Sequence, residues 1–418
     1  MLRLILCVMA CCLTLGAPAR GDEAEDNAIA EIKRLDGVVV RDEKLPGKPV
    51  IEVRFYGIPA LVGDSDLKGL APLKNLTTLV ILQSRVTDEG LGALAALPRL
   101  ATLDLRSEAV TDAGLKELVQ SKTLCNLTLA TPKVTEVGLK ELAALKNLRS
   151  LTIYNPQITD EGVKQLAKLP ALTHIVLGAS TISDTGLKTL ATLNHLATLS
   201  VNSSGITDTG LKSLGTLTAL NSLVLRCPKV TDAGLKELAP LKSLSALSLY
   251  DTQVTGSGLN VLGTHKELKS LTLDGNAITD AGIKEVGGLK NLTELYLGVP
   301  FVTDAGVKEL TSLKNVQILS LTAPKATDTG VRSLFVLSNL TELHLSGTPV
   351  TDTILKDLAA LKNLTVLGLS ATRVSDIGLK DLATLPKLQS LHLYETKVTG
   401  EGVAELQKAI PKCAISWR

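Results

Sequence analysis

Apolar residues follow two different spacings in turn along most of this chain. In residues 97–120, Leu103 and Leu105 flank Asp104, and this alternation is the period of a β-strand with one buried face. Leu115 and Leu118 lie three residues apart, which is the spacing of one side of a helix. The pattern therefore predicts a short strand, a turn and a short helix, after which the chain returns to begin the next strand.

The same unit returns every 24 residues without an insertion or deletion. A Thr-Asp pair marks it, from Thr87-Asp88 to the variant Thr399-Gly400, at fourteen positions in all. A fixed period in this range is typical of solenoids, in which each repeat stacks on the next. Strands stacked about 4.8 Å apart beside helices about 10 Å wide bend such a stack into an arc. We therefore expect an α/β fold whose inner face is a parallel sheet of about fifteen strands, roughly 70 Å long.

The marker residues predict how each helix begins. Thr111 is suited to cap the helix, because its hydroxyl can accept a hydrogen bond from an unpaired backbone N–H. Asp112 places a negative charge at the positive end of the helix dipole, and Lys116 is expected to form an ion pair with it. Glycine follows two residues after the Asp position in every repeat except at Ile354, and we expect it to let neighbouring helices approach closely.

The repeated unit L-x-x-L-x-L-x-x-(T/P/S)-x-V-T-D-x-G-L-K-x-L, over roughly residues 50–418, resembles the leucine-rich repeat proteins. It looks like the helix-containing, ribonuclease-inhibitor-like type, here with 24-residue repeats, that is found in bacterial secreted or envelope proteins. The resemblance implies a right-handed leucine-rich repeat solenoid, or horseshoe, with a parallel β-sheet on the concave face and short helices on the convex face.

One column of the repeat departs from that family. Many members carry Asn or Cys at the turn where this chain has residues such as Pro132, Thr348 and Thr372, and only Asn276 keeps the Asn. We therefore expect proline rigidity and short hydroxyl groups to hold these turns.

The N-terminus has the pattern of a secretory signal peptide over residues 1–21. Arg3 precedes an apolar run of about a dozen residues, which is shorter than a membrane span, and an A-x-A cleavage site follows at Ala17-Pro18-Ala19. An uncleaved anchor and a lipoprotein are the alternatives. We expect no membrane span in the mature chain.

The two ends of the solenoid need caps, because a terminal repeat would otherwise expose its core. Residues 22–62 are expected to form an N-terminal cap of a helix and short strands. Residues 63–410 form the repeat array of about 15 repeats, and residues 411–418 a C-terminal capping strand in which Trp417 occupies a strand position and closes the last layer.

Composition and motifs narrow the classes of function. Lys and Arg number 44 against 42 Asp and Glu, so no basic excess favours nucleic acid. No phosphate-binding loop, G-x-S-x-G, H-E-x-x-H or C-x-x-C motif occurs, and we expect neither an enzyme nor a cofactor. His344 and His392 share a column two strands apart, about 10 Å, which is too far for one zinc ion, so no metal site is expected. Cys125, Cys227 and Cys413 are expected to stay unpaired.

Residues that vary between repeats on the inner strands are the candidates for recognition. Most are Thr, Ser, Ala or Gly, and the larger ones are Tyr154, Tyr250, Tyr296, Tyr394, His174, His344, His392, Arg106, Arg226, Asp104, Asp274, Glu294 and Glu342. The densest group, which we name the concave patch, consists of Glu294, Tyr296, Glu342, His344, His392 and Tyr394. Ser320 and Gly368 lie between these large residues in one column, and notches are expected there.

The sequence therefore predicts a monomeric, non-enzymatic binding module that is exported to the periplasm, the cell surface or the medium. It would recognise an unknown protein or envelope polymer through its concave face. A structural envelope spacer without a specific ligand is the alternative hypothesis. A third hypothesis, a substrate-recognition subunit similar to F-box leucine-rich repeat adaptors, is opposed by the signal peptide and by the absence of any F-box-like segment in residues 1–62.

Overall fold

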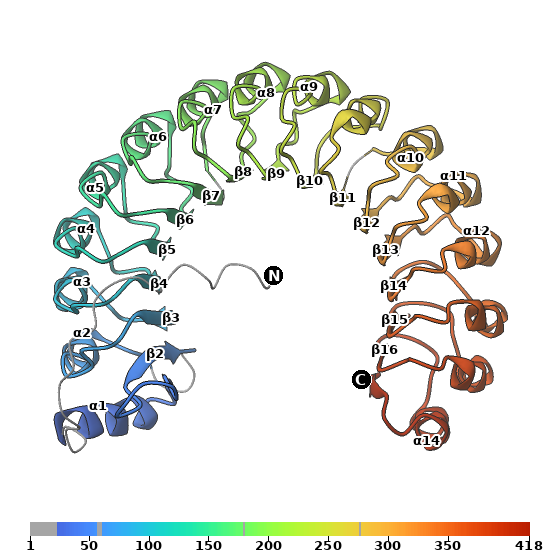
Figure 1. Cartoon of the computed structure of the whole chain (residues 1–418), viewed down its shortest axis with the longest axis horizontal. Coiled ribbons are helices and arrows are strands. Elements are labelled where there is room, and N and C mark those ends of the chain that lie inside the picture. The colour runs from blue at the N-terminus through green and yellow to red at the C-terminus, as the bar shows by residue number, and fades with distance from the viewer. Residues whose placement is uncertain (1–22, 57–60, 179, 276) are drawn as a thin grey trace.

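A computed structural model describes residues 23–56, 61–178, 180–275 and 277–418. The expected signal peptide at residues 1–21 and the lone turn Asn276 lie outside the described residues. The chain forms an open arc in which strands line the inner side and helices the outer side (Figure 1). This arrangement follows from the repeat, because each unit contributes one narrow strand and one wider helix.

The elements alternate strictly after the first hairpin. The strands are β1 Val38–Arg41, β2 Val50–Phe55, β3 Thr78–Ser84, β4 Thr102–Ser107, β5 Asn126–Ala130, β6 Ser150–Tyr154, β7 His174–Gly178, β8 Thr198–Asn202, β9 Ser222–Arg226, β10 Ala246–Tyr250, β11 Ser270–Asp274, β12 Glu294–Gly298, β13 Ile318–Thr322, β14 Glu342–His344, β15 Val366–Gly368, β16 Ser390–His392 and β17 Ala414–Ser416. The α-helices are α1 Glu23–Arg34, α2 Asp64–Lys68, α3 Asp88–Ala95, α4 Asp112–Leu118, α5 Glu136–Leu142, α6 Asp160–Leu166, α7 Asp184–Leu190, α8 Asp208–Leu214, α9 Asp232–Lys236, α10 Asp280–Gly287, α11 Asp304–Glu309, α12 Asp328–Ser333, α13 Asp376–Leu379 and α14 Gly400–Ala409. The 3₁₀-helices are η1 Leu259–Thr264, η2 Leu310–Ser312, η3 Leu334–Val336, η4 Asp352–Ala360 and η5 Lys380–Thr384.

All described strands belong to one sheet of 17, which is slightly wider than the fifteen expected. From β2 to β17 each strand pairs in parallel with the next in the chain, and β1 pairs antiparallel with β2. Along the array the paired residues are 24 apart, as for Leu247 with Leu271 and Leu271 with Leu295. The extra strands come from the two ends, which continue the sheet instead of covering it separately.

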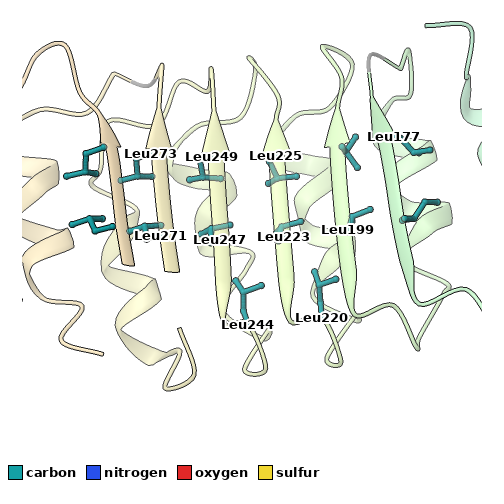
Figure 2. Packing of buried hydrophobic residues seen from close by; sticks show 14 of the residues in the cluster. Leu177, Leu199, Leu220, Leu223, Leu225, Leu244, Leu247, Leu249, Leu271 and Leu273 are labelled. Atoms are coloured by element: carbon teal, nitrogen blue, oxygen red, sulfur yellow. The ribbon is translucent and has the colours of Figure 1, made fainter. Parts of the chain in front are cut away.

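Leucine columns form the core between the sheet and the helices. Most strands bury two apolar residues, usually leucines, as with Leu223, Leu225, Leu247 and Leu249, which Figure 2 labels and which are fully buried or nearly so. Each such side chain contributes about 1.5–3 kcal/mol by leaving water. Because the columns run without interruption from repeat to repeat, the core is one continuous layer along the arc.

Both ends of this layer are covered by apolar side chains. At the first end α1 buries Ile29 and Ile32 against the β1–β2 hairpin, whose Phe55 is fully buried. At the other end β17 stops at Ser416, so Trp417 lies directly after the strand and not within it as expected. Its ring packs, partly buried, against the core.

The Thr-Asp marker links each repeat to the next. The carboxylate of Asp88 accepts hydrogen bonds from the backbone N–H of Thr111 (2.7 Å) and from its hydroxyl (2.6 Å). That hydroxyl in turn accepts from the N–H of Ala113 at 3.3 Å, which confirms the expected helix cap. We call this arrangement the Thr–Asp ladder. Its rungs join Asp64 to Thr87, Asp88 to Thr111, Asp112 to Thr135, Asp160 to Ser183, Asp184 to Thr207, Asp208 to Thr231, Asp232 to Thr255, Asp280 to Thr303, Asp304 to Thr327, Asp328 to Thr351, Asp352 to Ser375 and Asp376 to Thr399.

This role differs from the expected ion pair with the lysine four residues later. Asp112 faces Thr135 of the next repeat, and no ion pair joins it to Lys116. Where the lysine column does form an ion pair, its partner is another residue, as for Lys164 with Glu161 and Arg332 with Asp357. Two aligned donors satisfy a carboxylate better than one mobile ammonium group at the surface, where ion pairs add little.

The ladder lacks two rungs within the described residues. Glu136 and Gly256 replace the Asp, and the following Thr159 and Thr279 then make no side-chain capping hydrogen bond. The coincidence has a physical reason. When the Thr hydroxyl donates its hydrogen to the Asp carboxylate, its lone pairs point toward the helix N–H. Without the carboxylate, nothing holds the hydroxyl in the orientation that caps the helix.

The glycine column makes room for these aspartates. A methyl group at Gly114 would overlap the carboxylate of Asp88, and one at Gly138 would overlap that of Asp112. The group closest to each of these glycines is therefore mainly a side chain of the preceding repeat, and not only the neighbouring helix expected from the sequence.

In the described array, the two repeats without an α-helix are those with Gly256 at the Asp position and Ile354 at the glycine position, which form η1 and η4 instead.

The turns after the strands are held in two ways. In some repeats the first residue after the strand points inward, as Asn155 does when its amide donates to the carbonyls of Thr131 (3.0 Å) and Val134 (2.7 Å). In others the residue at the same position of the repeat is left-handed and the next one is buried, as with Ala371 (φ 53°) followed by Thr372, whose hydroxyl donates to the carbonyl of Leu369 at 2.6 Å. The expected short hydroxyls hold the second kind of turn, and a short hydroxyl also holds a turn of the first kind at Ser203, which donates to the carbonyl of Ile182 at 2.6 Å.

The ladder predicts opposite effects for two substitutions. Asp208→Ala removes the acceptor for two donors of Thr231 and is expected to lower the free energy of unfolding by about 1.5–3 kcal/mol. Glu136→Asp restores a missing rung and is expected to raise the free energy of unfolding. Urea unfolding of both variants measures this, with Glu117→Ala on the exposed side of α4 as the matched control, expected within about 0.5 kcal/mol of the parent. Equal effects of Asp208→Ala and Glu117→Ala would contradict the ladder.

The ladder also predicts a dependence on pH. Burial alone would raise the pKa of Asp232, but hydrogen bonds from Thr255, Gly258 and Gly256 hold it below its ordinary value of 3.8. A folded-state pKa below the unfolded one means that this stabilisation is complete above 3.8 and is lost as the pH falls through the folded value. We expect the difference in melting temperature between the parent and Asp232→Asn to shrink between about pH 6 and about pH 2. A difference that stays constant over this range would show that the ionised carboxylate does not matter.

Candidate functional site

The concave face is organised in columns that run across the strands. One column carries Thr272 on β11, Tyr296 on β12, Ser320 on β13 and His344 on β14, each directly paired with the next. It continues through Gly368 on β15 to His392 on β16. The side chains of one column stand on strands about 4.8 Å apart, so a large side chain must lean over its neighbour.

The two histidines of the concave patch lie together. Their rings stack with planes at 22° and centroids 6.5 Å apart, a shorter distance than the spacing of about 10 Å between the two strands that carry them. Gly368 allows this, because a methyl group there would overlap the ring of His344. The notch expected at Gly368 is therefore filled by a histidine ring.

Glu342 completes this histidine cluster, with its carboxylate 3.8 Å from Nε2 of His344. Burial lowers the pKa of His344, Glu342 opposes that shift, and the neighbouring His392 adds to it. The hydroxyl of Ser390 lies 3.2 Å from Nε2 of His392. Across the described part of the chain, His, Cys, Asp and Glu side chains form no group of three or more that could hold a metal ion.

Tyr296 belongs to a different feature, a hollow of about 410 Å³ that extends toward β10. Tyr250, Thr272, Asp274, Tyr296, Ser320 and Thr322 line it. Burial raises the pKa of Tyr296, and the charges of Glu294 and Glu342 raise it further. The hollow is thus polar, aromatic and in a negative environment, and Ser320 supplies the expected small residue beside the ring.

Tyr394, the last member of the concave patch, lies two residues beyond β16 with 42% of its surface exposed. The concave patch is therefore not one cluster. Glu342, His344 and His392 form one group, whereas Tyr296 lines the hollow together with Ser320. Glu294 precedes Tyr296 by two residues on β12, and Tyr394 lies near the C-terminal end.

Sequence reasoning placed Tyr250, Asp274 and Arg226 outside the concave patch. The structure brings them into one register, since Arg226 pairs with Tyr250 and Tyr250 with Asp274 across three strands. The guanidinium of Arg226 lies 5.1 Å from the centre of the Tyr250 ring and 3.2 Å from the carboxylate of Asp251. Their common spacing of 24 residues was the signal in the sequence that could have grouped them.

A second hollow, of about 400 Å³, adjoins Arg226 on its other side. Ser180, Asn202, Ser203, Pro228 and Asp251 contribute to its wall. Arg226 therefore separates two depressions, and its contacts with Tyr250 and Asp251 hold it between them.

None of the helices in the described part of the chain combines the length and apolar character required to cross a membrane.

Comparison with known proteins supports the fold. The family model described as Leucine Rich repeat matches residues 192–215, 266–287 and 336–359. A comparison with curated protein sequences gives no match. Among solved structures, an internalin from Listeria monocytogenes is 24% identical with a TM-score of 0.50, covering 88% of this chain and 94% of its own. A leucine-rich repeat protein from Leptospira interrogans is also 24% identical with a TM-score of 0.52, covering 85% and 95%. The chain is therefore a leucine-rich repeat solenoid, an open α/β fold with its parallel sheet on the inner face.

Proposed function

We propose that this chain is a non-enzymatic binding module that recognises a protein or an envelope polymer through its concave face. The observation that carries the proposal is the gathering of large polar and aromatic side chains on β12–β16. On β5–β8 the corresponding central positions hold Thr128, Thr152, Val176 and Ser200, which offer little to a partner. Aromatic rings and charged groups on a rigid surface are the side chains that dominate binding energy at interfaces.

The scaffold suits recognition because it needs no rearrangement to present this surface. The register of the sheet sets the position of each column, and the helices behind it are capped through the ladder. A partner that docks on such a face loses little free energy in ordering it. The same proposal includes export of a monomeric bacterial protein, which the signal-like segment at residues 1–21 supports. It also includes the ribonuclease-inhibitor-like subtype, which the helices on the outer side support.

A structural spacer without a specific ligand is the second candidate. The small side chains on the central strands and the regular ladder favour it, since both serve stacking alone. The two candidates differ in one respect: a spacer tolerates changes anywhere on its concave face, whereas a binding module does not tolerate changes at the concave patch.

Capture with the immobilised chain separates the two candidates. Material from the source cell's envelope or surroundings is passed over the parent protein, and bound molecules are identified and titrated. The variant Tyr296→Ala/His344→Ala/Tyr394→Ala is expected to weaken that binding at least about tenfold, because truncating an interface anchor costs about 1–2 kcal/mol or more.

The matched control changes three exposed residues of the convex face, Lys116→Ala, Val137→Ser and Lys140→Ala, and is expected to bind like the parent. Circular dichroism and melting temperature check that both triple variants fold. Equal binding by the two variants, or no specific capture at all, would favour the spacer and contradict the proposal.

A further inference from the structure

The hollow between β10 and β13 combines three features. Two aromatic rings line it, those of Tyr250 and Tyr296. Their positions on β10 and β12 place their Cα atoms on the order of 12 Å from each other. Thr272, Ser320 and Thr322 contribute small hydroxyl groups to its wall. It carries the carboxylate of Asp274, and none of the residues that line it is basic.

Its electrostatic environment is negative from more than one strand. Asp274 reaches across β12, where Gly298 makes room, since a methyl group at that position would overlap the carboxylate. Glu294 stands two residues from Tyr296 on the same strand, and Glu342 follows on β14. Because the chain as a whole is nearly neutral, with a net charge of +2, this local excess of carboxylates sets the sign of the potential here.

Arg226 shows what kind of group this surface accepts. Its guanidinium lies over the Tyr250 ring at 5.1 Å while it contacts the Asp251 carboxylate at 3.2 Å. It comes from β9, whereas the hollow begins on the β11 side of the same tyrosine. A second guanidinium entering the hollow would meet the same pair of partners, a tyrosine ring and a carboxylate, with Asp274 in the place of Asp251.

We propose that this hollow receives the side chain of an arginine from a protein partner. The guanidinium stacks against Tyr250 and Tyr296 and donates hydrogen bonds to Asp274 and to the hydroxyls of Thr272 and Thr322. A planar group with five donors fits such a mixed wall of rings and acceptors better than a compact ammonium group does. We rest this on the recognition function proposed above and add to it the chemical class of one anchor.

A small peptide tests the hollow without knowledge of the partner. The chain has only five tyrosines, so ring-labelled tyrosine yields five resonances, each assigned by its Tyr→Phe variant. The probe is acetyl-Gly-Arg-Gly-amide, and its uncharged analogue has citrulline in place of arginine. We expect the arginine peptide to shift the Tyr250 and Tyr296 resonances saturably, while Tyr154 and Tyr394 serve as internal controls on the same concave face. The citrulline peptide is expected to bind at least about fivefold more weakly.

Substitutions then assign the contacts. Asp274→Asn and Tyr250→Leu are each expected to weaken arginine-peptide binding at least about fivefold, whereas Tyr154→Leu, the matched change on β6, leaves it unchanged. Equal binding of the arginine and citrulline peptides would overturn the proposal, as would shifts spread evenly over Tyr154 and Tyr394. So would a response of Tyr250 and Tyr296 to chitobiose with none to arginine, because the hollow would then be a saccharide site.

Failure here is distinguishable from failure of the proposed function. If the peptide does not bind but the capture experiment still depends on Tyr296, His344 and Tyr394, the concave face recognises its partner without an arginine anchor. If the peptide does not bind and capture fails as well, the recognition function itself is wrong.

Discussion

The hydrogen bonds from a Thr or Ser to the Asp of the preceding repeat are the interaction on which the regularity of this solenoid depends. One carboxylate accepts from a backbone N–H and a hydroxyl of the next unit, and that hydroxyl caps the next helix. Where the rung is present, the helix therefore begins at a point that the previous repeat supplies. Interactions between neighbours of this kind are what make repeat arrays behave as linear chains of coupled units.

The glycine column depends on this interaction. The glycine after each Asp position gives the carboxylate of the previous repeat the space it occupies, so the glycine and the aspartate are a pair across repeats. The helix type does not depend on the rung. The repeats of η1 and η4 keep their own rungs, from Asp232 to Thr255 and from Asp328 to Thr351, whereas α6 and α10 lack one and are still α-helices.

The same rule of paired large and small residues governs the concave face. Strands about 4.8 Å apart leave little room for two large side chains in adjacent places of one column, and Arg226 accordingly lies over the neighbouring ring of Tyr250. Tyr154 lies over Gly178, Asp274 over Gly298, and His344 over Gly368. A glycine on this face is therefore space that its larger neighbour fills, and the first hollow is lined by Gly298 together with Thr and Ser residues. This constraint decides which surface side chains can be neighbours before any partner is considered.

The sequence by itself determined the repeat, the strand and helix of each unit, the helix caps and the existence of the arc. These follow from local periods and from a spacing that never slips, and local periods are written directly in the chain. What Asp112 binds, why Gly138 is needed and how the turns close were decided only by the tertiary structure, because each involves the residue about 24 positions away that stacking brings alongside. The candidate site divides in the same way. The sequence selected the large residues of the inner face, but only the lean of the side chains joined His344 to His392 and placed Tyr250, Asp274 and Tyr296 around one hollow. Side-chain lean depends on the size of the neighbours in two directions at once, and a one-dimensional pattern does not contain that information.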